Sequence, residues 1–297
     1  MKIINDIRGF KSPGKTIIAI GVFDGMHKAH RRIISQAVLR ARRKKIKSLV
    51  LTFWPHPRSK ASLNSLGHRL RMIEDLGVDI CVVARFTPAF ASLPAAAFVK
   101  DILARRFNAA EVFVGGNFRF GKAAEAGVRE LEKFSRGSGF TVKVFDILRS
   151  GRLAVSSTLL RGLIRRGMIK KARSILGRPV SVMGTVVKGS SLGGRLGFPT
   201  ANIMSHHEIL PPRGVYAVRV LAGDKKYRGI CYIGTRPTFK KSRETVEVHI
   251  FDFNRNIYSK VIEVQFIRKI RGEKRFSSSR ELIKQIKKDI NKAKAIF

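Results

Sequence analysis

Two histidines at three-residue spacing, His27 and His30, follow an apolar run and the turn GVFDG. If that run is a strand and a helix starts at the histidines, both side chains project from its first turn toward the same side. The open N–H groups of a helix start attract phosphate, and imidazoles beside them can stabilise charge as pyrophosphate leaves. Such a transfer needs no protein nucleophile. The alternative is that both are surface or capping histidines without a chemical role.

A second group of residues suited to chemistry lies in the segment GSSLGGRLGFPTAN. Gly189, Gly193 and Gly197 can let the backbone approach phosphate without a side-chain clash. The hydroxyl of Thr200 and the amide oxygen of Asn202 are hard oxygen ligands of the kind that binds Mg²⁺ together with ATP. Without these two ligands, the segment would be an ordinary flexible hairpin.

The residues around the two histidines alternate short apolar runs with amphipathic stretches, from 16 to about 147. Strands that alternate with helices indicate a parallel sheet with helical crossovers, so we predict a Rossmann-like α/β domain. Ligands of such sheets lie at the carboxyl ends of the strands, which is where the GVFDG turn falls. The expected strands contain TIIAIGVF, SLVLTF, VDICVVARF, EVFVGG and FTVKVFDI.

The pattern changes from Ser181 onward to short β-rich runs separated by Gly and Pro, which predict a small antiparallel barrel. Ser278 and Glu281 stand at capping-box spacing ahead of an apolar stripe, so a final helix should pack on this barrel. The predicted domains are 1–178 and 179–297. The expected strands of the barrel contain SVMGTVVKG, GVYAVRVLA, YRGICYIG, TVEVHIFDF and VIEVQFIRKI.

The composition fits a chain of two ordinary domains, with 297 residues of which 44% are hydrophobic. No apolar run approaches the roughly 18 residues of a membrane span, and the start lacks a secretory signal, so we expect a cytoplasmic protein with no membrane partner. Cys81 and Cys231 lie in apolar runs without a CxxC or a histidine at ligand spacing. They indicate core residues rather than a disulfide framework or a zinc site.

The net charge is +40, from 60 Lys and Arg against 20 Asp and Glu, which would ordinarily place nucleic acid first among the partners. The cations are spread over the whole chain, and no RNA- or DNA-binding motif accompanies them. The run 40–45 falls on an expected helix end, where the helix dipole favours cations. We therefore expect nucleic acid to bind only through nonspecific charge attraction, and acidic ligands such as ATP to be steered by this field.

Taken together, the motifs resemble those of the bacterial bifunctional riboflavin kinase/FMN adenylyltransferases, also called FAD synthetases. GVFDGMHKAH looks like the HxGH nucleotidylyltransferase signature, and TFWPHPR, VGGNFRFG and SSTLLRGLIRRG fit the same half of the family. GSSLGGRLGFPTANI, LPPRGVYAV, YIGTRPTF, VEVHIFDF and IRGEKRF fit the riboflavin kinase half, so the resemblance covers nearly the whole chain. It implies riboflavin, FMN and ATP as substrates, and Mg²⁺ as the cofactor.

In the first half, the resemblance implies that His27 and His30 contact the ATP phosphates and that Asn117 positions the reacting groups. His56 stands between two prolines on a rigid loop, and it would line the flavin or ATP site or be an ordinary loop histidine. Ser156 to Arg161 resemble the family's second phosphate-binding element, which hydroxyls at a helix start and an arginine fork would suit. The alternative is a simple N-cap followed by a solvent-facing arginine. The other predicted ATP- or phosphate-binding residues are Gly21, Phe23, Asp24, Ser156, Ser157, Thr158 and Arg161.

In the second half, the resemblance implies that Thr200 and Asn202 coordinate the metal and that Glu247 acts as the base on the riboflavin 5′-hydroxyl. Arg271 and Phe276 resemble the flavin-side element. Phosphoryl transfer depends mainly on positioning and charge neutralisation, so one metal, one carboxylate and a phosphate loop suffice. By position alone, Glu247 would be an outward strand residue, Phe276 a core residue and Arg271 a surface residue.

The sequence departs from the family pattern at several positions. Ala29 replaces the Gly of HxGH, and Val128 and Met168 stand where acidic residues are common; in the second half, Gly194 replaces a common Arg and Ser259 a usual Gly. We expect both flavin reactions, riboflavin to FMN and FMN to FAD. One alternative is a riboflavin kinase with a degenerate adenylyltransferase domain. Another, motivated only by the charge, is a nucleic-acid-binding protein built on an enzyme framework.

Overall fold

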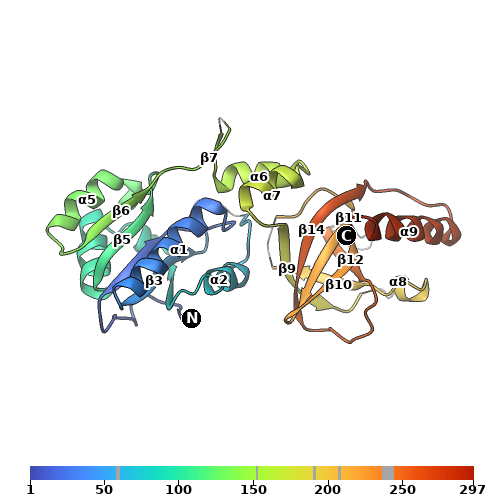
Figure 1. Ribbon diagram of the computed structural model, residues 1–297, viewed down its shortest axis with the longest axis horizontal. Coiled ribbons are helices and arrows are strands. Elements are labelled where there is room, and N and C mark those ends of the chain that lie inside the picture. Colours follow the sequence, from blue (N-terminus) through green and yellow to red (C-terminus); the bar gives the residue numbers. More distant parts are fainter. Residues whose placement is uncertain (58–60, 152, 190–191, 207–208, 236–243) are drawn as a thin grey trace. The chain divides into compact units, whose positions relative to one another are not determined.

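The computed structural model describes the chain except residues 58–60, 152, 190–191, 207–208 and 236–243 (Figure 1). Its tertiary contacts fall into two compact units. The first contains Met1–Ser62 and Leu66–Ser157, and the second contains Leu63–Ser65 and Thr158–Phe297. The domain division after residue 178 stays a prediction.

The first unit is built on a parallel six-stranded sheet in the order β1-β4-β3-β2-β5-β6. Both faces of the sheet are covered, and β2 is buried along its whole length, which is why the inner strands read as continuous apolar runs. The predicted α/β sheet is confirmed; the short edge strand β1 had not been predicted. The strands are β1 Lys2–Ile4, β2 Thr16–Ile20, β3 Lys47–Trp54, β4 Ile80–Arg85, β5 Ala109–Gly115 and β6 Thr141–Phe145.

Helix α1 (Lys28–Arg43) covers one face of this sheet (Figure 1). Its buried side chains, such as Ile34 and Val38, recur at helical spacing and pack with Phe113 in one core cluster. A second cluster fills the other face and includes Leu103 and Leu131. The remaining elements of this part are α2 Leu66–Glu74, α3 Pro88–Ala91, α4 Ala95–Ala97, the π-helix η1 Phe98–Arg106, the 3₁₀ helix η2 Lys122–Ala124, α5 Val128–Arg136, and the hairpin β7 Arg149–Ser150 and β8 Leu153–Ala154.

The second unit contains a closed antiparallel barrel in the order β10-β13-β12-β11-β14-β9. The predicted barrel is confirmed, with one strand more than expected. That strand, β10, is short, carries the polar Asn202 and follows Pro199, and it closes the barrel by pairing with both β9 and β13. The strands are β9 Val180–Val187, β10 Ala201–Ser205, β11 Gly214–Ala222, β12 Lys225–Thr235, β13 Glu244–Ile250 and β14 Val261–Arg271.

The predicted final helix is α9 (Ser279–Lys294), which packs on β11 and β12 through a cluster that includes Ala293 and Ala217. Its start is capped as expected, because the Ser278 hydroxyl accepts a hydrogen bond from the backbone N–H of Glu281 at 3.3 Å. The other helices after the first sheet are α6 Ser157–Arg165, α7 Ile169–Leu176 and α8 Leu192–Arg195.

Cys81 and Cys231 are buried free thiols, which confirms their interpretation as core residues. Burial raises the pKa of both thiols. In the part of the chain that the structure describes, no helix has the length and apolar character needed to cross a membrane.

Candidate functional site

The turn between β2 and α1 has an unusual backbone. Phe23, Gly25 and Met26 all have positive φ, at 51°, 85° and 43°. The Phe23 ring folds back over Gly21, where a Cβ would lie 2.9 Å from a ring carbon, and its edge meets the ring of His30 at a centroid distance of 5.3 Å. Gly21 is therefore needed so that the Phe23 ring can pack, and the ring in turn supports His30.

His27 and His30 lie together as the sequence predicts. His27 is the N-cap of α1, and its Nδ1 accepts a hydrogen bond from the backbone N–H of His30 at 3.4 Å. The two imidazole rings stack with centroids 3.6 Å apart. Burial lowers the pKa of His27 to about 4, and burial, His27 and Arg69 lower the pKa of His30 well below its usual value. Both imidazoles are therefore neutral at pH 7 before an anion binds.

A cavity of about 140 Å³ opens beside this histidine pair. It lies at the carboxyl ends of β5 and β6 and the start of α1, where an open parallel sheet binds its ligands. The structure thus brings five predicted site residues around one hollow. These five are His27, His30, Asn117, Ser156 and Ser157.

Asp24 and His56 meet next to the histidine turn. Asp24 is buried, and one of its carboxylate oxygens lies 3.9 Å from Nε2 of His56, which follows the cis Trp54–Pro55 bond. The backbone carbonyl of Asp24 accepts a hydrogen bond from the Ser157 hydroxyl at 2.8 Å. Ser157 is the first residue of α6, so this contact joins the turn before α1 to the second predicted phosphate-binding element.

Thr158 and Arg161 continue α6 but belong to the second compact unit. Their role at the ATP phosphates therefore stays a prediction.

Sequence reasoning missed a buried cation in the first unit, Arg69 on α2. Its side chain is 0% exposed, and its Nη1 donates to the carbonyls of Val22 at 2.8 Å and Phe53 at 3.2 Å. Among the described residues, its Nε and Nη2 have no hydrogen-bond partner. Burial lowers the pKa of Arg69, while the nearby charge of Asp24 raises it. Arg69 holds the strand end from which the histidine turn departs.

In the barrel, Asn202, Glu247 and Tyr232 form one row across three strands. Asn202 on β10 is the register partner of Glu247 on β13, and Glu247 is the register partner of Tyr232 on β12. Directly opposed residues point to the same face of a sheet, so the three side chains are neighbours. The row joins the predicted metal ligand Asn202 to the predicted base Glu247.

The glycines of the β9–β10 connection lie against the two predicted metal ligands. A Cβ at Gly189 would clash with the side-chain amide of Asn202, and one at Gly193 would lie 3.0 Å from Oγ1 of Thr200. Because these glycines lack side chains, they form a cradle that leaves room for the two hard oxygen donors. This arrangement fits a Mg²⁺ ion that keeps much of its water and binds phosphate. Gly197 has φ +84°, a conformation that favours glycine, whereas Gly194 faces open space.

His249, which the sequence analysis did not single out, holds the segment that carries Thr200. Its Nδ1 lies 2.8 Å from the carbonyl oxygen of Pro199, so the protonated nitrogen donates to that carbonyl. Its ring also meets Phe198 edge to face at 6.1 Å. His249 stands two residues after Glu247 on β13 and therefore faces the same side of the strand.

Arg271 and Phe276, the two predicted flavin-side residues, are in contact, with the guanidinium 5.7 Å from the ring centroid. The buried carboxylate of Asp289 on α9 accepts a hydrogen bond from Arg271 Nε at 2.8 Å. Nearby in sequence, Glu273 accepts a hydrogen bond from the Tyr232 hydroxyl at 2.6 Å. This hydrogen bond ties the segment after β14 to the row that contains Glu247.

A cavity of about 170 Å³ adjoins Thr200 in the barrel. Its lining combines apolar side chains such as Val186 and Ile250 with the amides of Asn254 and Asn256. The turn that borders it contains Ser259 at φ 60°, a conformation in which a glycine would be unstrained. The positive φ at this position explains why the family usually has a glycine there.

The three residues of the first half that depart from the family pattern lie at different places. Ala29 lines the cavity beside the histidines. Val128 opens α5, where Glu130 accepts a hydrogen bond from the Gly127 N–H at 2.7 Å and supplies the carboxylate at that helix start. Met168 is the N-cap of α7 and makes no side-chain cap, so this helix lacks the hydrogen bond that an acidic residue would provide.

Comparisons with known proteins cover both parts of the chain. A family model described as FAD synthetase matches residues 10–159, and one described as riboflavin kinase matches residues 176–297. A crystal structure of a protein described as a macrolide-efflux protein from Streptococcus pneumoniae has a TM-score of 0.86 and 28% identity, and it covers 98% of both chains.

Curated relatives match over the full length. The bifunctional riboflavin kinase/FMN adenylyltransferases of Buchnera aphidicola and Escherichia coli K12 are each 34% identical over 100% of this chain and over 99% and 98% of their own lengths. The Bacillus subtilis protein of the same name is 32% identical over 95% of this chain and 93% of its own. The chain therefore belongs to the family of bifunctional riboflavin kinase/FMN adenylyltransferases.

Proposed function

We propose that the chain makes FAD in two ATP-dependent steps, with riboflavin phosphorylated in the barrel and the resulting FMN adenylylated in the first unit. The observation that carries this proposal is the register pairing of Asn202 with Glu247 inside a glycine cradle. It supports a metal ligand and a base at one point of the barrel. A separate cavity with two neutral histidines supports the second step.

In the kinase step, Glu247 accepts the proton of the riboflavin 5′-hydroxyl as that oxygen attacks the γ-phosphorus of ATP, and ADP leaves with the bridging oxygen. Thr200 and Asn202 would hold the cofactor Mg²⁺, which would supply positive charge against the phosphates. Gly189, Gly193 and Gly197 keep side chains away from the phosphate chain. The cavity next to Thr200 suits the base and ribose of ATP, because it is mainly apolar and offers two amides.

Arg271 and Phe276 lie against the flavin on the other side of this site. Asp289 fixes the Arg271 side chain, so the guanidinium is oriented before the flavin arrives. The planar guanidinium and the Phe276 ring both offer faces on which a flat isoalloxazine can stack.

In the adenylyl transfer, the phosphate of FMN attacks the α-phosphorus of ATP and pyrophosphate leaves. His27 and His30 donate hydrogen bonds to the phosphates, and their protonation becomes more favourable once an anion is bound, because the negative charge offsets the cost of burying the imidazolium. Asn117 orients the reacting groups, while Ser156 and Ser157 offer hydroxyls beside the open N–H groups of α6.

The roles of the other predicted residues complete this proposal. Gly21, Phe23 and Asp24 shape the turn that carries the histidines, and His56 lines the same site beside Asp24. Thr158 and Arg161 bind ATP phosphates from α6. Both reactions take place in the cytoplasm, and nucleic acid binds only by nonspecific charge attraction.

Chromatography of the products formed from riboflavin, ATP and Mg²⁺ tests both steps at once. The wild-type protein should yield FMN and FAD. Asn202→Ala should abolish FMN formation and still convert supplied FMN to FAD, whereas His30→Ala should do the reverse. An unchanged kinase rate in Asn202→Ala would reject the assignment of the barrel site.

A kinase without adenylyl transfer is the second candidate, favoured by Ala29, whose methyl group faces the histidine cavity. Incubation of the purified protein with FMN and ATP separates the two candidates. Any FAD that forms only in the presence of the protein excludes a kinase without adenylyl transfer. If no FAD forms, Ala29→Gly tests whether the extra methyl group is the obstacle.

A further inference from the structure

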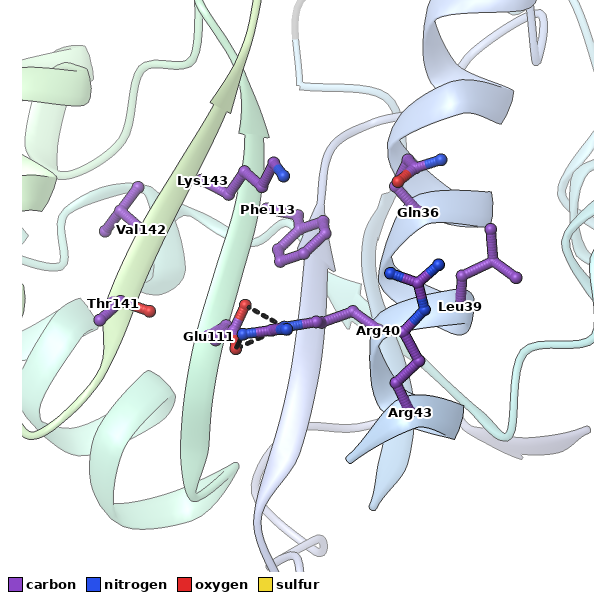
Figure 2. Close-up of a pocket in the computed structure, with 9 residues that line it drawn as sticks. All are labelled: Gln36, Leu39, Arg40, Arg43, Glu111, Phe113, Thr141, Val142 and Lys143. Carbon is purple, nitrogen blue, oxygen red and sulfur yellow. Dashed lines mark hydrogen bonds and ion pairs between the residues drawn. The ribbon is translucent and has the colours of Figure 1, made fainter. Parts of the chain in front are cut away.

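A third cavity, of about 420 Å³, lies in the first unit beside α1 (Figure 2). The histidines are at the start of α1, whereas this cavity is bordered by the second half of the helix, by the middle of β5 and by the first residues of β6. Its volume falls within the roughly 300–1,000 Å³ of small-molecule sites. The lining residues are Gln36, Leu39, Arg40, Arg43, Glu111, Phe113, Thr141, Val142 and Lys143.

The carboxylate in this cavity is already neutralised. Arg40 reaches from α1 across to β5, where its Nε donates to both oxygens of Glu111 at 2.8 and 3.1 Å (Figure 2). Lys44 Nζ lies 2.7 Å from one of the same oxygens. Hydrogen bonds and the charges of Arg40 and Lys44 accordingly lower the pKa of Glu111 against the opposing effect of burial. Glu111 therefore leaves no negative charge to balance the other cations.

Two further cations, Arg43 on α1 and Lys143 on β6, form opposite walls of the cavity (Figure 2). Within the part of the chain that the structure describes, neither makes an ion pair. The lining also contains apolar side chains, among them the buried Phe113 and Leu39, which is 45% exposed. The cavity thus combines unbalanced positive charge with several apolar side chains.

Purely structural roles explain Arg43 and Lys143 one at a time, but they do not explain why both line one cavity. A cation in the last turn of a helix is favoured by the dipole, which suits Arg43, and a lysine on an edge strand discourages pairing with another chain, which suits Lys143. Neither role requires the two to face each other across a hollow, and neither explains why Leu39 is exposed beside them.

We propose that this cavity binds a small organic phosphate. Its phosphoryl group lies between the guanidinium of Arg43 and the ammonium of Lys143, and its apolar part lies against Leu39. Guanidinium groups match phosphate oxygens with paired hydrogen bonds, and an added lysine supplies a second charge. The site is distinct from both ATP sites and does not depend on either proposed reaction.

Titration calorimetry of the full chain with phenyl phosphate, inorganic phosphate and phenol tests the chemistry of the ligand. Phenyl phosphate should bind more tightly than inorganic phosphate, and phenol should not bind. The double variant Arg43→Gln and Lys143→Gln should weaken phenyl phosphate binding by about tenfold or more, because two charge-assisted contacts are lost. Both substitutions are exposed, and adenylyl transfer should be unchanged.

The matched control is Arg129→Gln with Lys133→Gln. These exposed residues of α5 are also one arginine and one lysine of the same unit, so the control removes the same charge elsewhere. It should keep phenyl phosphate binding within about twofold, as screened distant charges act weakly. An equal loss in the control would show that the general charge of the protein binds the anion and would overturn the proposal.

Glu111→Gln provides a test of opposite sign. Removal of the carboxylate frees Arg40 and Lys44, so phenyl phosphate should bind several times more tightly. A damaged fold cannot produce this gain. No saturable binding in the wild-type protein, or unchanged binding in the Arg43 and Lys143 double variant, would exclude the site. Hydrogen exchange of residues 109–115 and 141–145 should slow on binding only where the site is intact.

Discussion

Tyr232 lies directly opposite Glu247 across β12 and β13, and its hydroxyl donates a 2.6 Å hydrogen bond to Glu273. Burial, the bond to Glu273 and the charges of Glu273 and Glu247 raise the pKa of Tyr232 to about 12. The tyrosine is therefore protonated at pH 7 and serves as the donor of this hydrogen bond. It places the segment with the predicted flavin residues beside the predicted base.

Tyr232→Phe should raise the KM for riboflavin severalfold and change kcat little, because the flavin-side segment loses its anchor while Glu247 stays in place. Steady-state kinase assays measure both constants. Glu273→Gln is the companion variant, since an amide oxygen can still accept the hydrogen bond, and its effect on KM should be smaller. Equal KM values in all three proteins would contradict the anchoring role.

Gly189→Ala should abolish riboflavin phosphorylation and leave FAD formation from supplied FMN intact. The added Cβ would clash with the Asn202 amide and displace it from Glu247. Gly194→Ala is the matched control, because a Cβ at Gly194 meets no atom within 4 Å. If both variants lose kinase activity alike, flexibility of the loop rather than the Gly189 contact is the cause.

The buried histidine pair should make the first unit sensitive to acid. The folded-state pKa of His27 lies near 4 against the usual 6.5, so the unfolded chain binds more protons between these values. Stability is therefore complete above pH 6.5 and falls as the pH drops toward 4, by up to about 3 kcal/mol from this group. His27→Asn keeps a good N-cap and should show a flatter dependence in urea unfolding followed over this range.

ATP binding should be coupled to proton uptake at the same histidines. Titration calorimetry of ATP in two buffers with different ionisation enthalpies would detect the uptake near pH 6.5, and His27→Asn should reduce it. Identical heats in both buffers would show that the imidazoles stay neutral with ATP bound.

Arg69→Met should lower adenylyl transfer by more than about tenfold and spare the kinase, because the loss of the hydrogen bonds to Val22 and Phe53 frees the end of β2. It should also cost about 1–3 kcal/mol of stability, since buried carbonyls lose their donors. Arg71→Met on the same helix is exposed and should be neutral. If Arg69→Lys restored the rate of adenylyl transfer but not the affinity for ATP, the charge of Arg69 alone, rather than its hydrogen bonds, would account for its role.

Ser259→Gly should stabilise the barrel by about 1 kcal/mol, because Ser259 has φ 60° and an L-residue is strained there. Thermal unfolding measures the gain. Ser259→Ala keeps a Cβ and should show no gain, so an equal shift of Tm in both variants would refute the strain argument.

The sheet, the barrel and the last helix were predictable because their core strands and helices repeat apolar residues at clear periods. Strand β10 was not, since it is short, starts after Pro199 and carries the polar Asn202. Only its pairing with β9 and β13 in the structure identifies it as a strand of the barrel.

The grouping of the candidate site residues was predictable where residue type and spacing coincide, as for His27 and His30 or for Thr200 and Asn202. Arg69 was missed because an arginine on an amphipathic helix is expected at the surface, and its carbonyl partners belong to β3 and the turn after β2. Tyr232 and His249 were missed because their hydrogen bonds to Glu273 and Pro199 join segments distant in sequence.

The pairing of β10 with β13 has a consequence for folding. Asn202 and Glu247 become neighbours only when β10 pairs with β13, and contacts between segments so far apart in sequence form late and cost loop entropy. Riboflavin phosphorylation therefore reports on this pairing. During refolding, its recovery should lag behind the recovery of secondary structure and follow the joining of β10 to β13.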